Sequence, residues 1–97
     1  MIDEKIITQL QHIFKNYIEI EKVLLFGSRA RGDNKNTSDI DICIFGNEID
    51  HLLLSKIYMD LDEVNTPLSF DILHFQELSK QELINNILNE GVEIYHV

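Results

Sequence analysis

Apolar and polar positions follow two different periods along the chain, and each period marks one kind of secondary structure. In three stretches the apolar residues recur every three or four positions, as they do on the buried side of an amphipathic helix. The first helix is expected at about residues 3–17 and the second at about residues 49–64. The third is predicted to open at a capping box, Ser79-Lys80-Gln81-Glu82, and to stop at Gly91. Its apolar stripe would comprise Leu83, Ile84, Ile87 and Leu88.

Short apolar runs between these helices predict β-strands. The polar segment 28–37 is expected to form one helical turn followed by a loop. Strands that alternate with helices in this way predict a single α/β domain over residues 1–97, with a small mixed sheet flanked by helices. The strands are expected at Val23–Phe26, Asp39–Phe45, Leu68–Phe75 and Val92–Val97.

Composition restricts the setting in which this domain works. Eight basic and 17 acidic residues give a net charge of −9, which disfavours direct binding to nucleic acid. The single cysteine, Cys43, excludes an internal disulfide and fits a reducing cytosol. The N-terminus lacks the pattern of a signal peptide, and no apolar stretch approaches the roughly 20 residues that span a bilayer. We therefore expect a cytoplasmic protein that binds neither nucleic acid nor membrane.

Three aspartates lie inside the predicted strands, where aspartate is normally depleted. Asp39 and Asp41 leave the same face of their strand, and Asp71 completes a three-carboxylate cluster if the third strand lies beside the second. At about 5–6 Å and an effective dielectric near 20, two such carboxylates repel by about 3 kcal/mol. No lysine or arginine in either strand offsets this repulsion. The aspartates are therefore either strand-end residues that reach water or ligands of a hard divalent cation, Mg²⁺ or Mn²⁺.

Gly27-Ser28 follows the first strand and opens the predicted helical turn. Such a turn presents backbone N–H groups and a hydroxyl to a phosphate, although it can also simply end a strand. A phosphate cradle beside a metal site suits nucleotide chemistry. Arg31 is the better candidate of two nearby arginines for a phosphate ligand, and the role of Arg29 is left open. Both arginines can instead stay in solvent or pair with Asp33 and the acidic stretch 60–63.

Other nucleotide and metal motifs are absent from the sequence. It contains neither GxGxxG nor GK[ST], and no HExxH zinc motif. Residues 33–39 superficially suggest a calcium loop, but the third position is Lys35 and the required glycine is missing. A metal-dependent glycosyltransferase also uses an Asp-x-Asp pair, but this chain is short for the usual two-lobed fold and Gly27-Ser28 would be unexplained.

The string GSRARG…SDIDI places ten residues between Gly27-Ser28 and Asp39-Ile40-Asp41. It resembles the G-S-x10-D-x-D signature of the polymerase-beta-type nucleotidyltransferase superfamily. It is most similar to the minimal nucleotidyltransferases, the MNT antitoxins of HEPN/MNT toxin–antitoxin pairs. The resemblance implies the nucleotidyltransferase fold, with two Mg²⁺ or Mn²⁺ ions on Asp39, Asp41 and Asp71. It also implies that Gly27 and Ser28 contact the triphosphate of ATP.

The same resemblance implies a reaction and a partner. An enzyme of this kind is expected to transfer AMP from ATP to a tyrosine hydroxyl of a HEPN toxin, in a hetero-oligomer with that toxin. Asp71 could take the proton from the acceptor hydroxyl. The alternative is a catalytically idle antitoxin that blocks its toxin by direct binding. The three intact aspartates favour the enzyme, because a protein that acts only by contact has no physical need for them.

Overall fold

The computed structural model describes residues 2–97, and its first element is the predicted amphipathic helix, α1 (Glu4–Lys15). Asp3 caps this helix, because its carboxylate accepts a hydrogen bond of 2.9 Å from the backbone N–H of Lys5. Leu10 and Phe14, one turn apart, are fully buried. The apolar side of α1 therefore faces the core, as the period of the sequence predicted.

Every other predicted element is present, with slightly different ends. The helices after α1 are α2 (Ser28–Arg31), α3 (His51–Leu61), the short 3₁₀ helix η1 (Phe75–Glu77) and α4 (Gln81–Glu90). The strands are β1 (Lys22–Phe26), β2 (Ile40–Phe45), β3 (Phe70–His74) and β4 (Val92–His96). Within the described residues, no helix has both the length and the apolar character needed to cross a membrane.

The strands form one four-stranded mixed sheet in the order β3-β2-β1-β4. β1 pairs antiparallel with both β2 and β4, whereas β2 and β3 run parallel, joined by the crossover helix α3. The mixed α/β architecture predicted from the sequence is therefore confirmed. β3 and β4 are the two edge strands of the sheet.

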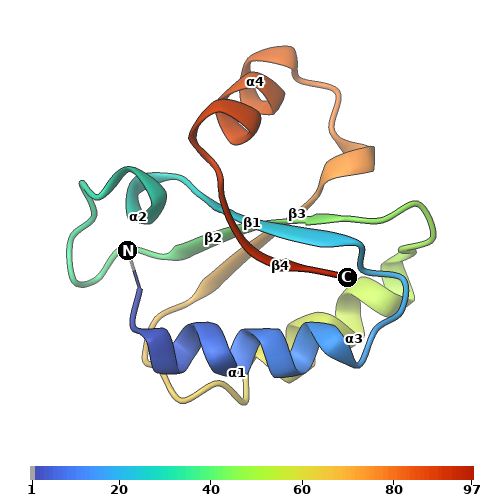
Figure 1. The fold of residues 1–97 in the computed structure, drawn as a ribbon, viewed down its shortest axis with the longest axis horizontal. Helices are drawn as coiled ribbons and strands as arrows, with labels where there is room; N and C mark the ends of the chain where they lie inside the picture. Colours follow the sequence, from blue (N-terminus) through green and yellow to red (C-terminus); the bar gives the residue numbers. More distant parts are fainter. Residues whose placement is uncertain (1) are drawn as a thin grey trace.

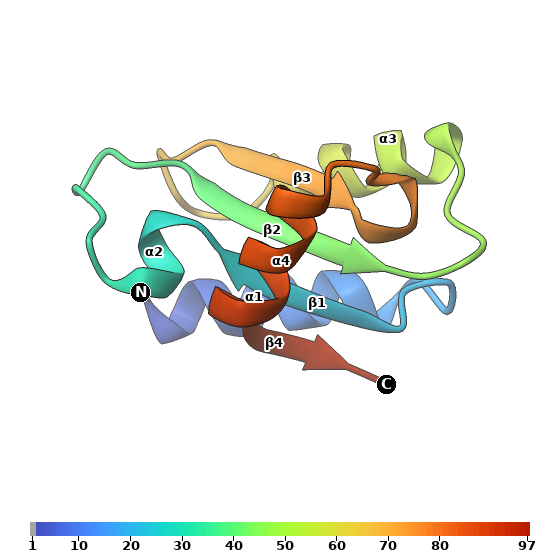
Figure 2. The same ribbon diagram turned by 90° about the horizontal axis from the view of Figure 1, so that it is seen from above.

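Helices cover both faces of this sheet (Figures 1 and 2). On one face, α1 and α3 bury the larger core, which includes Ile40, Ile42 and Ile44 of β2. On the other face, α4 covers a smaller core that contains Cys43 and Phe45. Alternate residues of β2 thus face opposite layers, as the period of two predicted.

The start of α4 differs from its prediction. The helix begins at Gln81, its N-cap residue is Lys80, and no side chain caps it. The predicted capping box is therefore wrong, because Ser79 lies one residue too early to serve as the N-cap. The predicted apolar stripe of α4 is also only partly buried, since Ile87 is fully buried but Leu88 is 53% exposed.

Candidate active site

The ends of three strands meet at one end of the sheet. Because β1 runs antiparallel to β2, its last residue, Phe26, lies opposite Asp41 near the start of β2. Asp41 in turn lies opposite Asp71 near the start of β3. Both aspartates are on the α4 side of the sheet, since each lies two residues before a side chain of the smaller core, Cys43 in β2 and Leu73 in β3. The parallel pairing of β2 and β3 therefore makes neighbours of two residues that are 30 positions apart in the sequence.

Asp39 lies immediately before β2, not inside it as predicted. Its side chain is exposed, as is that of Asp71, whereas Asp41 is half-buried. The interpretation that the aspartates reach water fits Asp39 and Asp71, but it does not fit the half-buried Asp41. The predicted site therefore has one partly desolvated carboxylate between two that are open to solvent.

Gly27 makes room for the Asp41 carboxylate. Its backbone has φ 75° and ψ −156°, a conformation that is essentially restricted to glycine. A Cβ atom at this position would lie 2.4 Å from Oδ2 of Asp41. Ser28 follows as the first residue of α2, and the carbonyl of Gly27 accepts hydrogen bonds of 3.1 Å from the N–H groups of Ala30 and Arg31. The predicted glycine-serine turn is therefore packed directly against the predicted carboxylates.

The carboxyl of Asp41 is electrostatically perturbed. Its pKa is raised, first because burial disfavours the anion and then because Asp71 and Asp39 repel it. The nearby cation Arg31 acts in the opposite direction on the same pKa. Both aspartates therefore lie close enough to Asp41 to act on its charge, and the condition for the predicted cluster, that β3 lies beside β2, is met.

The three aspartates do not form a ready metal-binding group in this structure. Among residues 2–97, no three or more His, Cys, Asp or Glu side chains form a group that could hold a metal ion. Like charges repel, which favours side-chain conformations that keep the three carboxylates apart. The donor chemistry nevertheless fits Mg²⁺ or Mn²⁺, because the site offers hard carboxylate oxygens, and Gly27 leaves open space for Oδ2 of Asp41.

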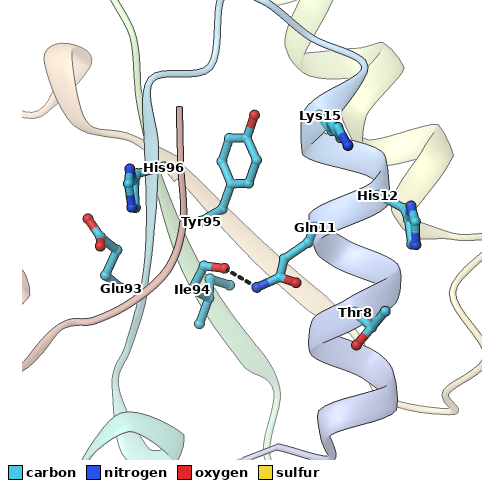
Figure 3. Close-up of a pocket in the computed structure, with 8 residues that line it drawn as sticks. All are labelled: Thr8, Gln11, His12, Lys15, Glu93, Ile94, Tyr95 and His96. Atoms are coloured by element: carbon cyan, nitrogen blue, oxygen red, sulfur yellow. Dashed lines mark hydrogen bonds between the residues drawn. The ribbon is translucent and has the colours of Figure 1, made fainter.

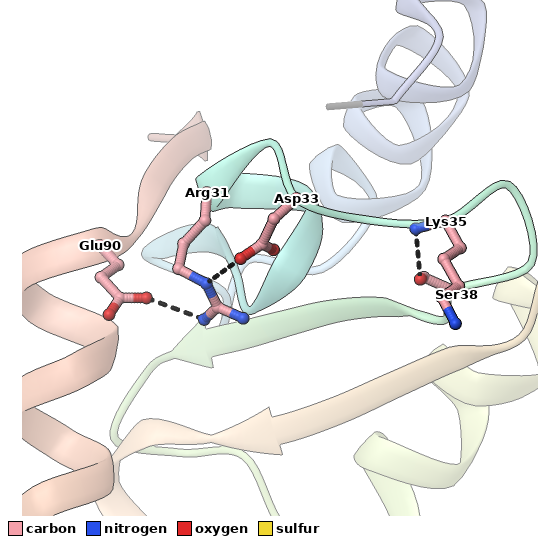
Figure 4. A network of polar contacts seen from close by, with 5 residues as sticks. All are labelled: Arg31, Asp33, Lys35, Ser38 and Glu90. Carbon is pink, nitrogen blue, oxygen red and sulfur yellow. Dashed lines mark hydrogen bonds and ion pairs between the residues drawn. The ribbon is translucent and has the colours of Figure 1, made fainter.

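Arg31 sits above this end of the sheet and is held by two acidic residues (Figure 4). Its Nε donates to Oδ2 of Asp33 at 3.2 Å, and its Nη1 donates to Oε2 of Glu90 at 3.0 Å. Hydrogen bonds to Glu90 and to Asp33 raise the pKa of Arg31. Of the alternatives that the sequence left open for Arg31, the structure shows pairing with Asp33 and not with residues 60–63. Its second partner is Glu90, at the end of α4.

Arg29, whose role the sequence left open, is a buried structural residue. Only 6% of its surface is exposed. Its Nε donates to the carbonyl of Ser38 at 3.0 Å, and its Nη2 lies 3.4 Å from the carbonyls of Lys35 and Asn36. A buried guanidinium needs such acceptors to offset its desolvation. Arg29 thereby holds the loop that delivers Asp39, a role that no local sequence signal indicates.

Two further titratable residues of the sheet, Cys43 in β2 and His74 in β3, have structural roles. Burial raises the pKa of the Cys43 thiol to about 12, so that it stays a neutral apolar group below the site. Nε2 of His74 lies 2.6 Å from the carbonyl of Gly46, which makes this histidine a satisfied buried residue.

A separate groove lies between α1 and the edge strand β4 (Figure 3). Gln11 reaches across it, and its Nε2 donates to the carbonyl of Ile94 at 2.9 Å. None of the predicted site residues lines this groove, which is formed by Thr8, Gln11, His12, Lys15, Glu93, Ile94, Tyr95 and His96. It is therefore distinct from the carboxylate site.

Comparison with known proteins gives the same family as the sequence signature. Residues 8–97 match the family "Polymerase beta, Nucleotidyltransferase". The proposed protein adenylyltransferase MJ0604 of Methanocaldococcus jannaschii is 32% identical over 98% of this chain and 100% of its own length. A second proposed protein adenylyltransferase of that organism, MJ0435, is 36% identical over 77% of this chain and 80% of its own length.

Solved structures show the same fold at lower sequence identity. A chain from a toxin–antitoxin crystal structure with AMP-PNP has a TM-score of 0.76 and 21% identity, and the match covers 99% of this chain and 75% of that one. A chain from the complex of tri-AMPylated Shewanella oneidensis HEPN toxin with MNT antitoxin has a TM-score of 0.73 and 16% identity, over 97% of this chain and 72% of that one. With the family match over residues 8–97, the chain belongs to the polymerase beta nucleotidyltransferase family.

Proposed function

We propose that this chain is an antitoxin that transfers AMP from ATP to a tyrosine hydroxyl of a partner HEPN toxin. The observation that carries the proposal is the register of Asp41 with Asp71, directly beside Gly27-Ser28. Relatives described as protein adenylyltransferases and structural neighbours from toxin–antitoxin complexes, one with an AMPylated toxin, support this choice of reaction and partner.

Asp39, Asp41 and Asp71 are the residues that would hold two divalent ions, Mg²⁺ or Mn²⁺. When bound, such ions neutralise phosphate charge and stabilise the attacking and leaving oxygens of an in-line displacement. The negative charge of Asp41 is disfavoured in the protein by itself. Asp41 would therefore gain from a cation at this place.

The remaining roles belong to residues that bind substrate or move a proton. Gly27 and Ser28 would bind the triphosphate, the serine through its hydroxyl and both through the turn that they form. Arg31 would be drawn from its exposed ion pairs with Asp33 and Glu90 towards the incoming phosphates. Asp71, exposed on an edge strand, is accessible to the hydroxyl of a partner and would accept its proton.

A protein acceptor fits this chain better than a nucleic acid. The net charge of −9 opposes a polyanion, and Asp39 and Asp71 face open solvent without a covering wall. A partner protein would supply both the acceptor hydroxyl and that wall, which makes complex formation a condition for rapid transfer. We expect the reaction in the cytoplasm, where Cys43 stays reduced.

Ser28→Ala is expected to slow AMP transfer by about 10²–10³-fold, because it removes one hydrogen-bond donor to the leaving pyrophosphate in a site that the partner closes. The loss should be the same with ATP, GTP and CTP, which single-turnover assays with each nucleotide would measure. Ser55→Ala, on the exposed side of α3, is the matched control and should leave the rate unchanged. A loss confined to ATP would instead assign Ser28 to the base.

The function itself is tested by incubating the protein with labelled ATP and Mg²⁺ under three conditions. The protein is kept alone, mixed with RNA, or mixed with a HEPN toxin encoded next to its gene, and each mixture is analysed by mass spectrometry. We expect added AMP on a tyrosine of the toxin and slow turnover otherwise. Label on RNA but not on the toxin would reject the proposal. No label, with the toxin still inhibited, would favour the antitoxin that acts only by contact.

A further inference from the structure

Tyr58 of α3 completes the hydrogen bonding of the edge strand β3 at one residue. Its hydroxyl accepts a hydrogen bond of 3.1 Å from the N–H of Ile72 and lies 3.3 Å from the carbonyl of the same residue, to which it donates. One phenol thus satisfies both outward-facing backbone groups of Ile72, as a neighbouring strand would do. Ile72 is buried, and Tyr58 is 37% exposed, so the contact lies at the rim of the core.

This contact fixes the peptide group that follows Asp71. Ile40 donates from its N–H to the carbonyl of Ser69 at 2.9 Å, so the backbone groups of Ser69 face β2. In a parallel ladder the direction alternates, which turns the carbonyl of Asp71 towards β2 and the N–H of Ile72 outward. That carbonyl and that N–H belong to one planar peptide group. β2 therefore holds one side of this plane and the Tyr58 hydroxyl holds the other.

We infer that Tyr58 is a positioning residue for Asp71, an inference that rests on the function proposed above. Asp71 lies on an edge strand, which has no second strand to restrain it. The Tyr58 hydroxyl supplies that restraint and so fixes the direction in which the Asp71 side chain leaves the sheet towards Asp41. Among the described residues, the hydrogen bonds of the Tyr58 hydroxyl go to the backbone of Ile72, so Tyr58 acts on Asp71 through that backbone.

An alternative role for Tyr58 is only to protect the edge strand β3 from pairing with another strand. The opposite edge of the sheet argues against this alternative. There Gln11 donates to the carbonyl of Ile94, which is one backbone acceptor and no donor among the described residues. Tyr58 engages a donor and an acceptor of the residue that follows a candidate catalytic aspartate. Blocking an edge against another strand does not require that position. Positioning Asp71 does require it.

The test compares Tyr58→Phe with Tyr17→Phe in the full chain together with the toxin. Tyr17 is a matched control, because its hydroxyl donates to the carboxylate of Asp60 and so joins the loop after α1 to α3, not to β3. Tyr58→Phe is expected to lower kcat for AMP transfer by about 10–100-fold, within the range for a misplaced catalytic group, and to change KM for ATP less than twofold. Tyr17→Phe should leave kcat unchanged even if it lowers thermal stability as much.

Hydrogen exchange at the Ile72 amide gives a readout that needs no turnover. Tyr58→Phe should speed this exchange at least tenfold, and Tyr17→Phe should not. In an Asp71→Asn background, Tyr58→Phe should lower the residual rate little further, because both changes act on the same group. A full additional loss there, equal kcat losses in the two tyrosine variants, or unchanged exchange in an active Tyr58→Phe protein would each overturn the inference alone. Absence of transfer by the wild type would overturn the proposed function and this inference with it.

Discussion

Asp41→Asn is expected to abolish AMP transfer, by about 10³-fold or more, while it makes the metal-free protein more stable. The loss follows because Asp41 is the central carboxylate of the site, opposite Asp71 and in contact range of Gly27. The gain follows because burial and two neighbouring carboxylates raise the pKa of Asp41, so its ionised form costs folding free energy at pH 7. Because solvent screens a half-buried carboxylate, removing that cost should raise the free energy of unfolding by less than about 1 kcal/mol, and Tm by at most roughly 4–8 °C.

The gain in stability of Asp41→Asn is expected to depend on pH. A carboxyl whose pKa is higher in the folded than in the unfolded state contributes its full stability below the unfolded pKa, near 4. That contribution is lost as the pH rises through the raised folded pKa of Asp41. The stability of Asp41→Asn should therefore exceed that of the wild type at pH 7, and the difference should vanish towards pH 3. Thermal unfolding between pH 3 and pH 8, in the presence of a chelator, measures both limits.

A matched control separates the site from the overall charge. Glu48→Gln removes one negative charge from an exposed loop, away from the three aspartates. An equal gain in stability from Glu48→Gln would mean that relief of the net charge of −9 explains the result. Calorimetry of Mg²⁺ or Mn²⁺ with ATP completes the test, because unchanged affinity in Asp39→Asn/Asp41→Asn protein would contradict the predicted metal site.

Gly27→Ala is expected to damage both the fold and the reaction. A methyl group there would lie 2.4 Å from Oδ2 of Asp41, and the backbone of Gly27 has φ 75° and ψ −156°. Strain of about 1–3 kcal/mol is typical when another residue adopts this conformation, and displacement of the Asp41 carboxylate adds to it. We expect a loss of about 2–4 kcal/mol in the free energy of unfolding and a loss of at least about 10²-fold in transfer.

Gly32→Ala is the control for this prediction. Gly32 also has a positive φ, of 85°, but no atom lies within 4 Å of a Cβ placed there. The variant should therefore lose only the roughly 1–2 kcal/mol of a left-handed residue and keep its transfer rate within about threefold. Denaturant titration and single-turnover kinetics on both variants decide the matter. Equal effects of the two substitutions on transfer would refute the proposal that Gly27 matters through its contact with Asp41.

Patterns confined to one segment allowed prediction of the elements and of part of the site. The period of two in residues 39–45 placed Asp41 on the face of Cys43 and Phe45, and the structure confirms that face. The Gly-Ser and Asp-x-Asp spacing predicted the family, which the match over residues 8–97 confirms. The capping box at Ser79 failed because the exact first residue of a helix depends on packing of the preceding turn, which four sequence letters do not determine.

Contacts between distant segments were decided only by the tertiary structure. The sequence placed Asp71 beside Asp41 only on condition that the third strand lay next to the second, and the parallel pairing of β2 and β3 met that condition. The ion pair of Arg31 with Glu90 joins residues from α2 and α4, and the hydroxyl of Tyr58 serves a strand that begins 12 positions later. The period of apolar residues follows from the geometry of a single helix or strand, so it can be read from the sequence. Which strands become neighbours depends on how whole faces are buried against each other, and that is a property of the folded chain.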